Sequence, residues 1–220
     1  MTPETAALTV IETITAMAAE QKPLMLRVIP EDGATFWTHY PKGDARSVSC
    51  KARWYYHVHA AGSRDEDEHG HFHLFLHRTQ LPTGLEPKVW PPQGEDAKAH
   101  VTHVIGLSIN TLGIPRAWFA TNRFVTNEFL YPADVMIDHL TDFNVDDTKE
   151  DDLVNRFVTA MVALYREEIA DLMRRRDEMQ EHLVADLGDA AYEKGSGVEV
   201  LAQIPIDLDA KISSLELEDA

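Results

Sequence analysis

Two runs of alternating residues between Tyr55 and His77 constrain the fold of this chain more than any other feature. The first is Tyr55-Tyr56-His57-Val58-His59, and the second is His69-Gly70-His71-Phe72-His73-Leu74-Phe75-Leu76-His77. Side chains alternate between two faces along a β-strand, so each run predicts a strand with its histidines on one face. If the runs pair as an antiparallel hairpin, imidazoles stand opposite imidazoles with their Cβ atoms about 4.5–5.5 Å apart.

The histidine face of this hairpin predicts a metal site. A solvent-facing sheet normally carries Thr, Lys, Glu and Ser, and six histidines on one side bring no advantage there. A pH sensor, in which protonated histidines repel one another, is a second alternative. Same-face positions along one strand lie about 6.5–7 Å apart, so one ion can bind only neighbouring rings. The expected ligands are His57, His59, His71 and His73, with His69 at the loop edge as a replacement and with His77 and His103 left open.

The ligand type narrows the chemistry of this site without fixing the metal. All-nitrogen coordination suits iron, copper or zinc, so the expected cofactor is a divalent transition metal of unspecified identity. Cys50 is the only cysteine, which excludes a disulfide within the chain and zinc sites built from several thiolates. A chain of 220 residues has enough core to fold without structural zinc, so we expect an open coordination position.

These features lead to two hypotheses of different kinds. The first is an enzyme with a mononuclear histidine site that acts on a small molecule. Oxygen or redox chemistry is favoured over hydrolysis or lyase chemistry, because Tyr55, Tyr56 and Phe75 flank the histidines. The alternative is a metal-binding or metal-delivery protein without turnover, in which the acidic segment 65–68 attracts cations. A haem pocket that uses one of the histidines also stays open.

Three further side chains are candidate catalytic residues. Arg123 follows a strand-like segment and can hold a carboxylate or phosphate in a bidentate hydrogen bond. Glu128 can serve as a general base or as a carboxylate ligand, and Tyr55 lies on the histidine face of its run. The structural alternative is a salt bridge between Arg123 and Glu128 near a helix start, without a part in catalysis.

The pair His57 and His59 on a strand resembles the first metal motif of the cupin family. That family has a glutamate about four or five residues after its second histidine, where this chain has Ser63 and Arg64. The second cupin motif, in which proline and glycine precede a third histidine, does not follow. The resemblance therefore covers three residues and does not imply the cupin fold.

The rest of the chain predicts an α+β fold in one domain, residues 1–220, built on a small antiparallel sheet or partial barrel. Apolar residues at helical spacing predict two flanking helices. One is N-terminal, at 3–21, with Leu8, Ile11, Ile14 and Ala18 on one stripe, and the other is a long C-terminal helix at 148–187. The histidine-rich β core is expected at 50–121, an edge strand at 198–208 and an acidic tail at 209–220.

Charge and hydropathy argue against several classes of partner. A formal net charge of −17 disfavours nucleic acid and anionic lipid surfaces, because both bind clustered Lys and Arg. No run of about 18 apolar residues is present to span a membrane, and no N-terminal targeting segment is recognisable, so a cytoplasmic protein is expected. A straight helix over 148–187 would extend about 60 Å. It could not bury its whole apolar stripe within one small domain, which predicts a homodimer through this helix.

Overall fold

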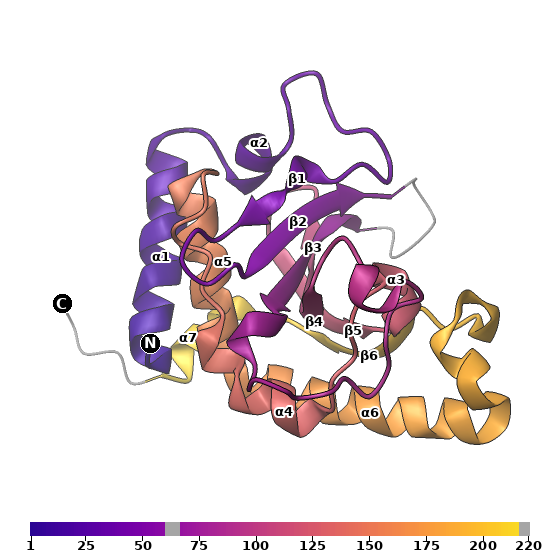
Figure 1. Cartoon of the computed structure of the whole chain (residues 1–220). Coiled ribbons are helices and arrows are strands. Elements are labelled where there is room, and N and C mark those ends of the chain that lie inside the picture. The colour runs from indigo at the N-terminus through magenta and orange to yellow at the C-terminus, as the bar shows by residue number, and fades with distance from the viewer. Residues whose placement is uncertain (60–66, 216–220) are drawn as a thin grey trace.

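A six-stranded antiparallel sheet forms the centre of the protein (Figure 1). The structure is a computed structural model, and it describes residues 1–59 and 67–215. The strands follow one another across the sheet in chain order, as β1 (Tyr40–Arg46), β2 (Arg53–Val58), β3 (Glu68–His77), β4 (Val101–Asn110), β5 (Pro115–Thr121) and β6 (Val200–Pro205). Each strand pairs antiparallel with its neighbours. Within the described residues β1 and β6 do not pair, so the sheet is not closed into a barrel.

Helices pack against this sheet, which confirms the predicted α+β class. They are α1 (Pro3–Ala19), α2 (Leu24–Val28), α3 (Arg123–Thr126), α4 (Ala133–Asp138), α5 (Asp152–Leu164), α6 (Arg166–Leu187) and α7 (Leu208–Ser213). Short 3-10 turns lie at Arg78–Gln80, Gly94–Asp96, Leu140–Asp142, Gly188–Tyr192 and Lys194–Ser196. The predicted N-terminal helix corresponds to α1, and α6 is the long C-terminal helix. Across residues 1–59 and 67–215, no helix is both long and apolar enough to cross a membrane.

The side of α1 that packs against the protein is not the one that its sequence predicts. The side that packs on α5 carries mostly small or slender residues, namely Ala6, Ala7, Val10, Thr13 and Met17. Leu8, Ile11 and Ile14, which the sequence places on the buried stripe, are instead 41%, 39% and 42% exposed. Alanines at the contact let the two helix axes approach closely. The hydrophobic pattern of the sequence marks the larger side chains and does not show that the alanine side allows this close packing.

The single helix expected at 148–187 is two helices that meet at Tyr165. Asp151 caps the first of them, α5, by accepting hydrogen bonds from two backbone amides of the first turn. At Tyr165 the backbone leaves the helical range, with φ −103° and ψ 24°. α5 packs on α1, whereas α6 runs in a different direction beside β5, β6 and α4 (Figure 1). The bend lets both halves bury apolar side chains within one chain, as Leu172 and Met173 do. A homodimer through this helix stays a prediction. The reason for it, a straight helix over 148–187, is not present in the structure.

The two faces of the sheet differ in chemistry. One face carries large buried apolar side chains, among them Trp54, Phe72, Leu74, Ile105, Leu107 and Trp118. Trp54 also donates a hydrogen bond of 3.0 Å to Asn155 of α5, so this face is the one that the helices cover. The opposite face carries His57 of β2, His71 and His73 of β3, and His103 of β4. The hydrophobic core therefore lies on one side of the sheet and leaves the histidine side free to form a site.

The remaining boundaries follow the sequence closely. β2 to β5 lie within the expected core of 50–121, and β6 lies within the edge strand expected at 198–208. β1 adds a strand where no clear pattern was visible. α7 occupies the start of the predicted acidic tail at 209–220, whose last five residues lie outside the described part of the chain. Residues 65 and 66 of the acidic segment 65–68 lie outside it as well.

Candidate metal centre

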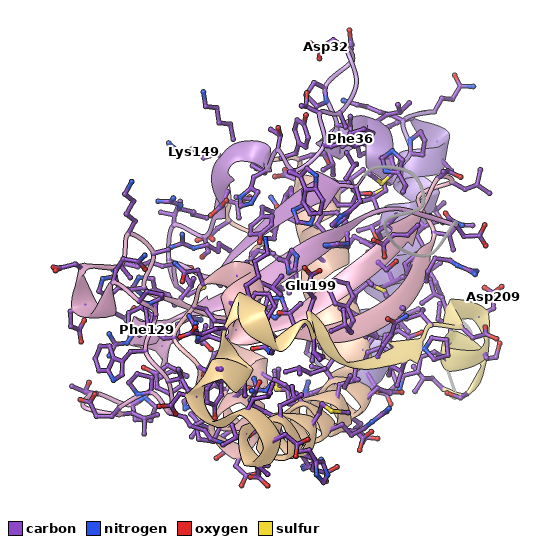
Figure 2. All side chains as sticks on the ribbon, turned by 90° about the vertical axis from the view of Figure 1, so that its right-hand side faces the viewer. Asp32, Phe36, Phe129, Lys149, Glu199 and Asp209 are labelled. Atoms are coloured by element: carbon purple, nitrogen blue, oxygen red, sulfur yellow. The ribbon has the colours of Figure 1, made fainter. Side chains whose placement is uncertain are left out.

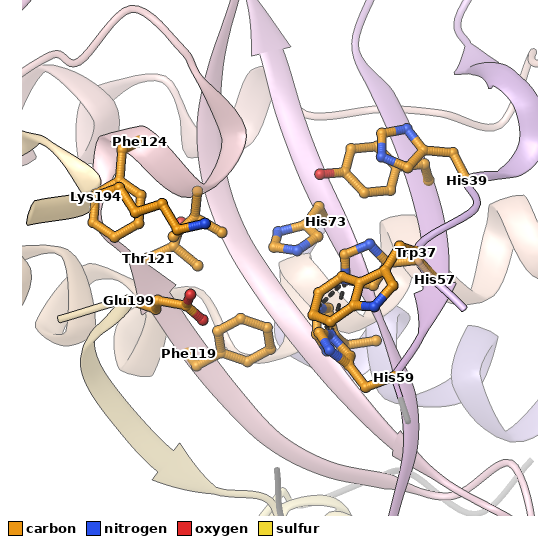
Figure 3. A pocket seen from close by; sticks show the side chains of 13 residues that line it. Trp37, His39, His57, His59, His73, Phe119, Thr121, Phe124, Lys194 and Glu199 are labelled. Atoms are coloured by element: carbon orange, nitrogen blue, oxygen red, sulfur yellow. Dashed lines mark hydrogen bonds between the residues drawn. The ribbon is translucent and has the colours of Figure 1, made fainter. Parts of the chain in front are cut away.

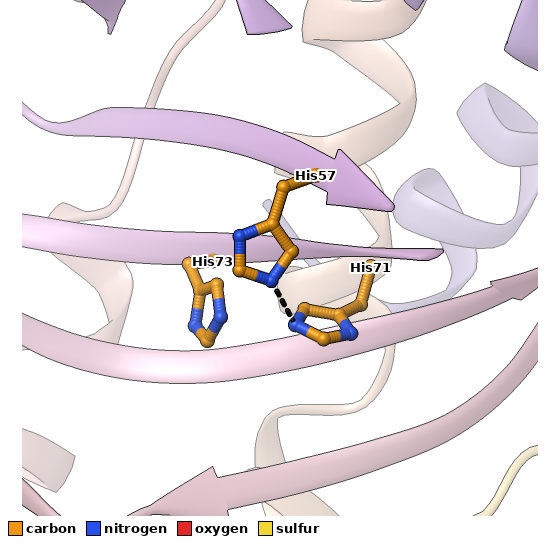
Figure 4. A group of neighbouring side chains, drawn as sticks. All are labelled: His57, His71 and His73. Atoms are coloured by element: carbon orange, nitrogen blue, oxygen red, sulfur yellow. Dashed lines mark hydrogen bonds between the residues drawn. The ribbon is translucent and has the colours of Figure 1, made fainter. Parts of the chain in front are cut away.

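The pairing of β2 with β3 places histidines from both strands against one another. The register sets His57 directly opposite His71, and Tyr55 opposite His73. The rings of His57, His71 and His73 are buried and share one face (Figure 4), with ring centroids between 4.4 and 5.2 Å apart. His59 follows the end of β2, and its ring centroid lies 4.8 Å from those of His57 and His71. The structure therefore brings the four principal predicted ligands together.

Three ring nitrogens of this cluster point at one another. The Nε2 atom of His57 lies 2.7 Å from Nε2 of His71 and 3.1 Å from Nε2 of His59. The Nε2 atoms of His59 and His71 are 3.4 Å apart. A circle through three points with these separations has a radius of about 1.8 Å, which is shorter than the zinc–nitrogen bond of about 2.0–2.1 Å. The three nitrogens could therefore hold one ion at bonding distance.

Hydrogen bonds around the cluster can set the ring tautomers that metal binding needs. The Nδ1 atom of His71 lies 2.9 Å from Oε1 of Glu68, and Ser108 donates to the other oxygen of Glu68 at 2.6 Å. The Nδ1 atom of His73 lies 2.9 Å from Nε2 of His103. When each Nδ1 carries the proton and donates it outward, Nε2 keeps its lone pair for an ion. A carboxylate that accepts from the far nitrogen of a ligand histidine is a common feature of protein metal sites.

A β-bulge at the start of β3 decides which residues join the cluster. The register against β4 shifts between Glu68 and Gly70, so the alternation of side chains changes phase there. Glu68 consequently contacts His71, whereas Nδ1 of His69 lies 2.8 Å from the hydroxyl of Tyr56, a residue of the helix-covered face. His69 therefore does not join the clustered rings, which corrects its prediction as a replacement ligand.

The sequence does not decide whether His77 and His103 are metal ligands, and the structure places them at different distances from the cluster. His103 is buried behind His73, and its Nδ1 lies 3.3 Å from the hydroxyl of Thr121. Burial, and secondly the charge of Arg176, lowers the pKa of His103 to about 3, so this ring stays neutral. His77 lies at the other end of β3, where its side chain caps the following turn. His103 is therefore a supporting neighbour of the cluster, and His77 is remote from it.

A cavity of ≈ 290 Å³ borders the histidine cluster (Figure 3). Aromatic rings form much of its wall, and they belong to Trp37, Tyr55, Phe119 and Phe124. Its other polar groups come from His39, Thr121, Lys194 and Glu199. Neither Lys194 nor Glu199 forms an ion pair with another residue of the described chain. The cavity thus offers one ammonium and one carboxylate group to a small molecule beside the histidines.

Two aromatic residues, Trp37 and Phe119, pack against the cluster. The first depends on an unusual backbone conformation and the second on a glycine beneath its ring. Trp37 has a φ of 66°, a left-handed conformation that residues other than glycine seldom adopt. Its ring lies edge-on to His59, with 4.3 Å between centroids. The Phe119 ring lies 4.9 Å from that of His71 and over Gly106, where an added Cβ would come within 2.2 Å of the phenyl group. Gly106 therefore provides the space that lets Phe119 pack against the cluster.

A fifth histidine on the cavity wall, His39, has its own carboxylate partner. His39 stacks on Tyr55 with 3.7 Å between ring centroids, and its Nδ1 lies 3.2 Å from Oδ1 of Asp44. The buried Arg53 lies 3.6 Å from the other oxygen of Asp44. Burial raises the pKa of Tyr55 far above its ordinary value, and the charges of Asp44 and Glu128 add to this effect. Tyr55, predicted as a catalytic residue, thus lines the cavity as a protonated phenol.

Arg123 and Glu128 both lie outside the cavity wall, which corrects their prediction as catalytic residues. Arg123 donates from Nη2 to the carbonyl of Tyr192 at 2.9 Å, and within the described chain it forms no direct ion pair with Glu128. Glu128 is buried near the backbone of His103, and burial raises its pKa to about 8 despite the nearby arginines. Arg123 therefore anchors the turn that precedes Lys194, and Glu128 is a largely neutral acid at pH 7.

Several cavity residues carried no clear signal in the sequence. Residues 36–40 are rich in aromatic side chains, but nothing in the sequence indicates that they lie near the hairpin. Glu68 belongs to an acidic run, and only the bulge turns it toward the histidines. Lys194 and Glu199 lie more than a hundred residues from the hairpin in the chain. They reach the cavity because β6, which follows them, pairs with β5.

One family model covers almost the whole chain. The family is described as a domain of unknown function, DUF6969, and its model matches residues 4–206, which include the entire histidine cluster. The chain belongs to this family. The family description gives neither a ligand nor a reaction, so the candidate centre rests on the geometry of its residues. Neither a curated protein nor a solved structure matches the chain.

Proposed function

We propose that the protein is a metal-dependent enzyme with a mononuclear site formed by His57, His59, His71 and His73. The observation that carries this proposal is the convergence of three Nε2 atoms at 2.7 to 3.4 Å from one another. Imidazole nitrogens that face each other repel through their lone pairs unless a proton or a cation lies between them. One divalent transition metal (iron, copper or zinc) satisfies all three nitrogens at once.

Two overlapping donor groups support this site and suggest different chemistry. His57, His71 and His73 offer ligand atoms within 4.8 Å of one another, and three histidines with an open position form the donor set of water-activating zinc sites. His59, Glu68 and His71 form a second such group, with the two-histidine, one-carboxylate composition of non-haem iron oxygenases. Because Glu68 contacts Nδ1 of His71, it supports the site as an outer partner of a ligand, whichever metal the histidines hold.

The cavity beside the cluster supports an enzyme more than a metal-delivery protein. A delivery protein needs no space for a second molecule, whereas the cavity of ≈ 290 Å³ can hold a small substrate beside the ion. The ligand rings are also buried, with His71 and His73 at 2% and 0% exposure. Burial of this kind slows exchange of an ion with solvent or with an acceptor protein.

We place oxygen or redox chemistry ahead of hydrolysis or lyase chemistry at this site. Nitrogen-rich coordination suits iron and copper as well as zinc, and four histidines exceed the three that water-activating zinc sites use. Trp37, Phe119 and Phe124 give part of the cavity an aromatic wall beside the histidines. Lys194 and Glu199 can bind charged groups of the substrate opposite the histidines.

Elemental analysis of protein purified without a histidine tag tests the metal site. We expect about one transition-metal ion for each chain, and His71→Ala should lose most of it because His71 belongs to both donor groups. His182→Ala is the matched control, since His182 is an exposed residue of α6. Equal metal content in the two variants would contradict the assignment.

The rate of metal exchange separates the enzyme from the delivery protein. An enzyme should retain its ion during hours of dialysis against a moderate chelator and should consume oxygen or turn over a small molecule when loaded. A delivery protein should lose its ion within minutes or bind several ions. Fast loss, combined with transfer to an apo-acceptor, would favour the alternative function.

A further inference from the structure

A second cavity lies on the helix-covered side of the sheet, at the other end of β6 from the histidine site. Its volume is ≈ 580 Å³, and its apolar wall includes Ile14, Leu24, Leu112, Phe157 and Ile206. Figure 2 shows the separation, because Glu199 of the histidine cavity precedes β6 and Asp209, on the rim of this second cavity, follows it. The walls come from α1, α2, α5, α7 and the turn between β4 and β5, so the cavity forms only in the folded chain.

Exposed apolar side chains continue outward from this cavity. Leu8 and Ile11 extend the row begun by Ile14 along α1, at spacings that place them side by side on a helix. Leu112, at the tip of the turn between β4 and β5, is 74% exposed. The surface therefore combines a hollow with a protruding apolar residue next to it. A small molecule enclosed in the hollow would leave Leu8, Ile11 and most of Leu112 in water.

The rim of the cavity carries charges of both signs. Arg116 is half exposed, and its ion pair with the highly exposed Asp67 is long, at 3.6 Å, which makes it a weak surface contact. Asp209 forms no ion pair within the described residues. Asp207, in contrast, caps α7 by accepting a hydrogen bond of 2.9 Å from the amide of Ala210. The rim thus presents one weakly paired cation and one free anion.

We propose that this surface binds the same surface of a second copy of the chain. In a two-fold dimer both copies use the same surface patch. Each apolar or charged group in the patch must therefore find its partner within the same patch of the other copy. Here Leu112 of each copy enters the cavity of the other, and Arg116 lies against Asp209 of the partner subunit. The exposed residues of α1 complete the buried area. This interface does not involve α6, the second half of the predicted 148–187 helix, which buries Leu172 and Met173 within its own chain.

Sedimentation velocity of the full chain over a range of concentrations tests the interface. We expect a dimer at micromolar concentration, and Leu112→Asp should weaken it at least tenfold. Because Leu112 is an exposed turn residue, the variant should keep its fold, which circular dichroism checks. Met179→Asp on α6 is the control for a dimer through the long helix and should leave the dimer unchanged. Metal content is measured on the same samples, so failure of the interface is distinct from failure of the metal site.

A charge exchange gives a second, independent test. Arg116→Asp and Asp209→Arg should each weaken the dimer, since each sets like charges against one another across the two-fold axis. The double variant should restore it, because every reversed charge then meets a reversed partner. A monomer at all concentrations up to about 100 µM, or a dimer broken by Met179→Asp and not by Leu112→Asp, would overturn the proposal. Native mass spectrometry that detects a tightly held apolar compound in a monomer would overturn it as well.

Discussion

Glu68 joins the histidine cluster to the next strand of the sheet. Its two carboxylate oxygens lie 2.9 Å from Nδ1 of His71 and 2.6 Å from the hydroxyl of Ser108 in β4. A carboxylate at this position orients the ring and increases its basicity as a ligand. It also offsets part of the charge of a bound cation. Glu68 is therefore expected to act on the metal through His71.

Glu68→Gln should weaken metal binding about 10–100-fold, because the amide can keep a hydrogen bond but removes the negative charge. Calorimetric titration of the metal-free protein with zinc measures this change. Glu86→Gln, at an exposed carboxylate, is the control and should bind zinc as the parent does. If the two variants bind zinc equally well, Glu68 does not support the ligand in this way.

Glu128 makes the stability of the protein depend on pH. Burial raises the pKa of this carboxyl from 4.5 to about 8, so the folded chain holds a proton that the unfolded chain releases between these two values. The free energy of unfolding should therefore fall as pH rises through this window, by up to about 1.4 kcal/mol for each pH unit from this group. Glu128→Gln should remove that contribution, since glutamine resembles the protonated acid at every pH.

Urea unfolding at pH 5 and pH 8 measures the effect of Glu128→Gln. The parent and the variant should be closest in stability at pH 5, and the variant should be the more stable of the two at pH 8. Glu178→Gln, at an exposed residue of α6, should follow the parent at both values. Parallel losses in the parent and in Glu128→Gln would contradict a raised pKa at Glu128.

At the scale of elements, the turns after α6 close one side of the histidine cavity. Arg123 donates to the carbonyl of Tyr192 at 2.9 Å, and Asn122 donates to the carbonyl of Ala191 at 2.8 Å. Both donors directly follow β5, so the end of a rigid strand holds the turn. Lys194 comes two residues later and lines the cavity. The position of Lys194 therefore depends on contacts outside the cavity.

Arg123→Ala should loosen this turn without removing the metal. Loss of one buried hydrogen bond should speed amide exchange in residues 188–197 about two- to tenfold, whereas the ligand histidines keep their contacts. Hydrogen–deuterium exchange with mass spectrometry measures the first effect, and elemental analysis the second. Arg174→Ala, at an exposed residue of α6, should change neither. A loss of metal in Arg123→Ala would instead connect this turn directly to the ion.

At the scale of the whole molecule, stability and chemistry are divided between the faces of one sheet. The helix-covered face contains the main apolar cluster, so we expect the chain to fold without a metal. The histidine face places several polar rings where an ion can bind. An ion that binds only the folded state adds its binding free energy to a structure that is already formed.

Metal binding should therefore stabilise a protein that is folded without it. At a free metal concentration one hundred times the dissociation constant, the free energy of unfolding should rise by about 2.7 kcal/mol. Denaturant unfolding of the metal-free protein, with and without added ion, measures this rise. His182→Ala should show the same rise and His71→Ala should not. A metal-free chain that is unfolded would show that the ion has a structural role.

The sequence by itself determined that His57, His59, His71 and His73 lie on one face of a hairpin. Alternation of side chains is a property of each strand's own backbone, so it can be read without knowing the rest of the fold. The same local reasoning predicted the α+β class and the two flanking helices. It also placed His69 with the ligands, which is wrong. The bulge between Glu68 and Gly70 changes the alternation of side chains there, and it arises only in the pairing with β4.

Only the tertiary structure decided which surfaces meet. The bend at Tyr165, the exposed side of α1 and the position of Arg123 outside the cavity all depend on contacts between distant segments. Lys194 and Glu199 reach the histidines because β6 pairs with β5, although nothing near them in the chain indicates it. Periodicity records which face of an element is apolar. The face that is finally buried is the one that lowers the free energy of the whole chain, and this depends on all of its partners together.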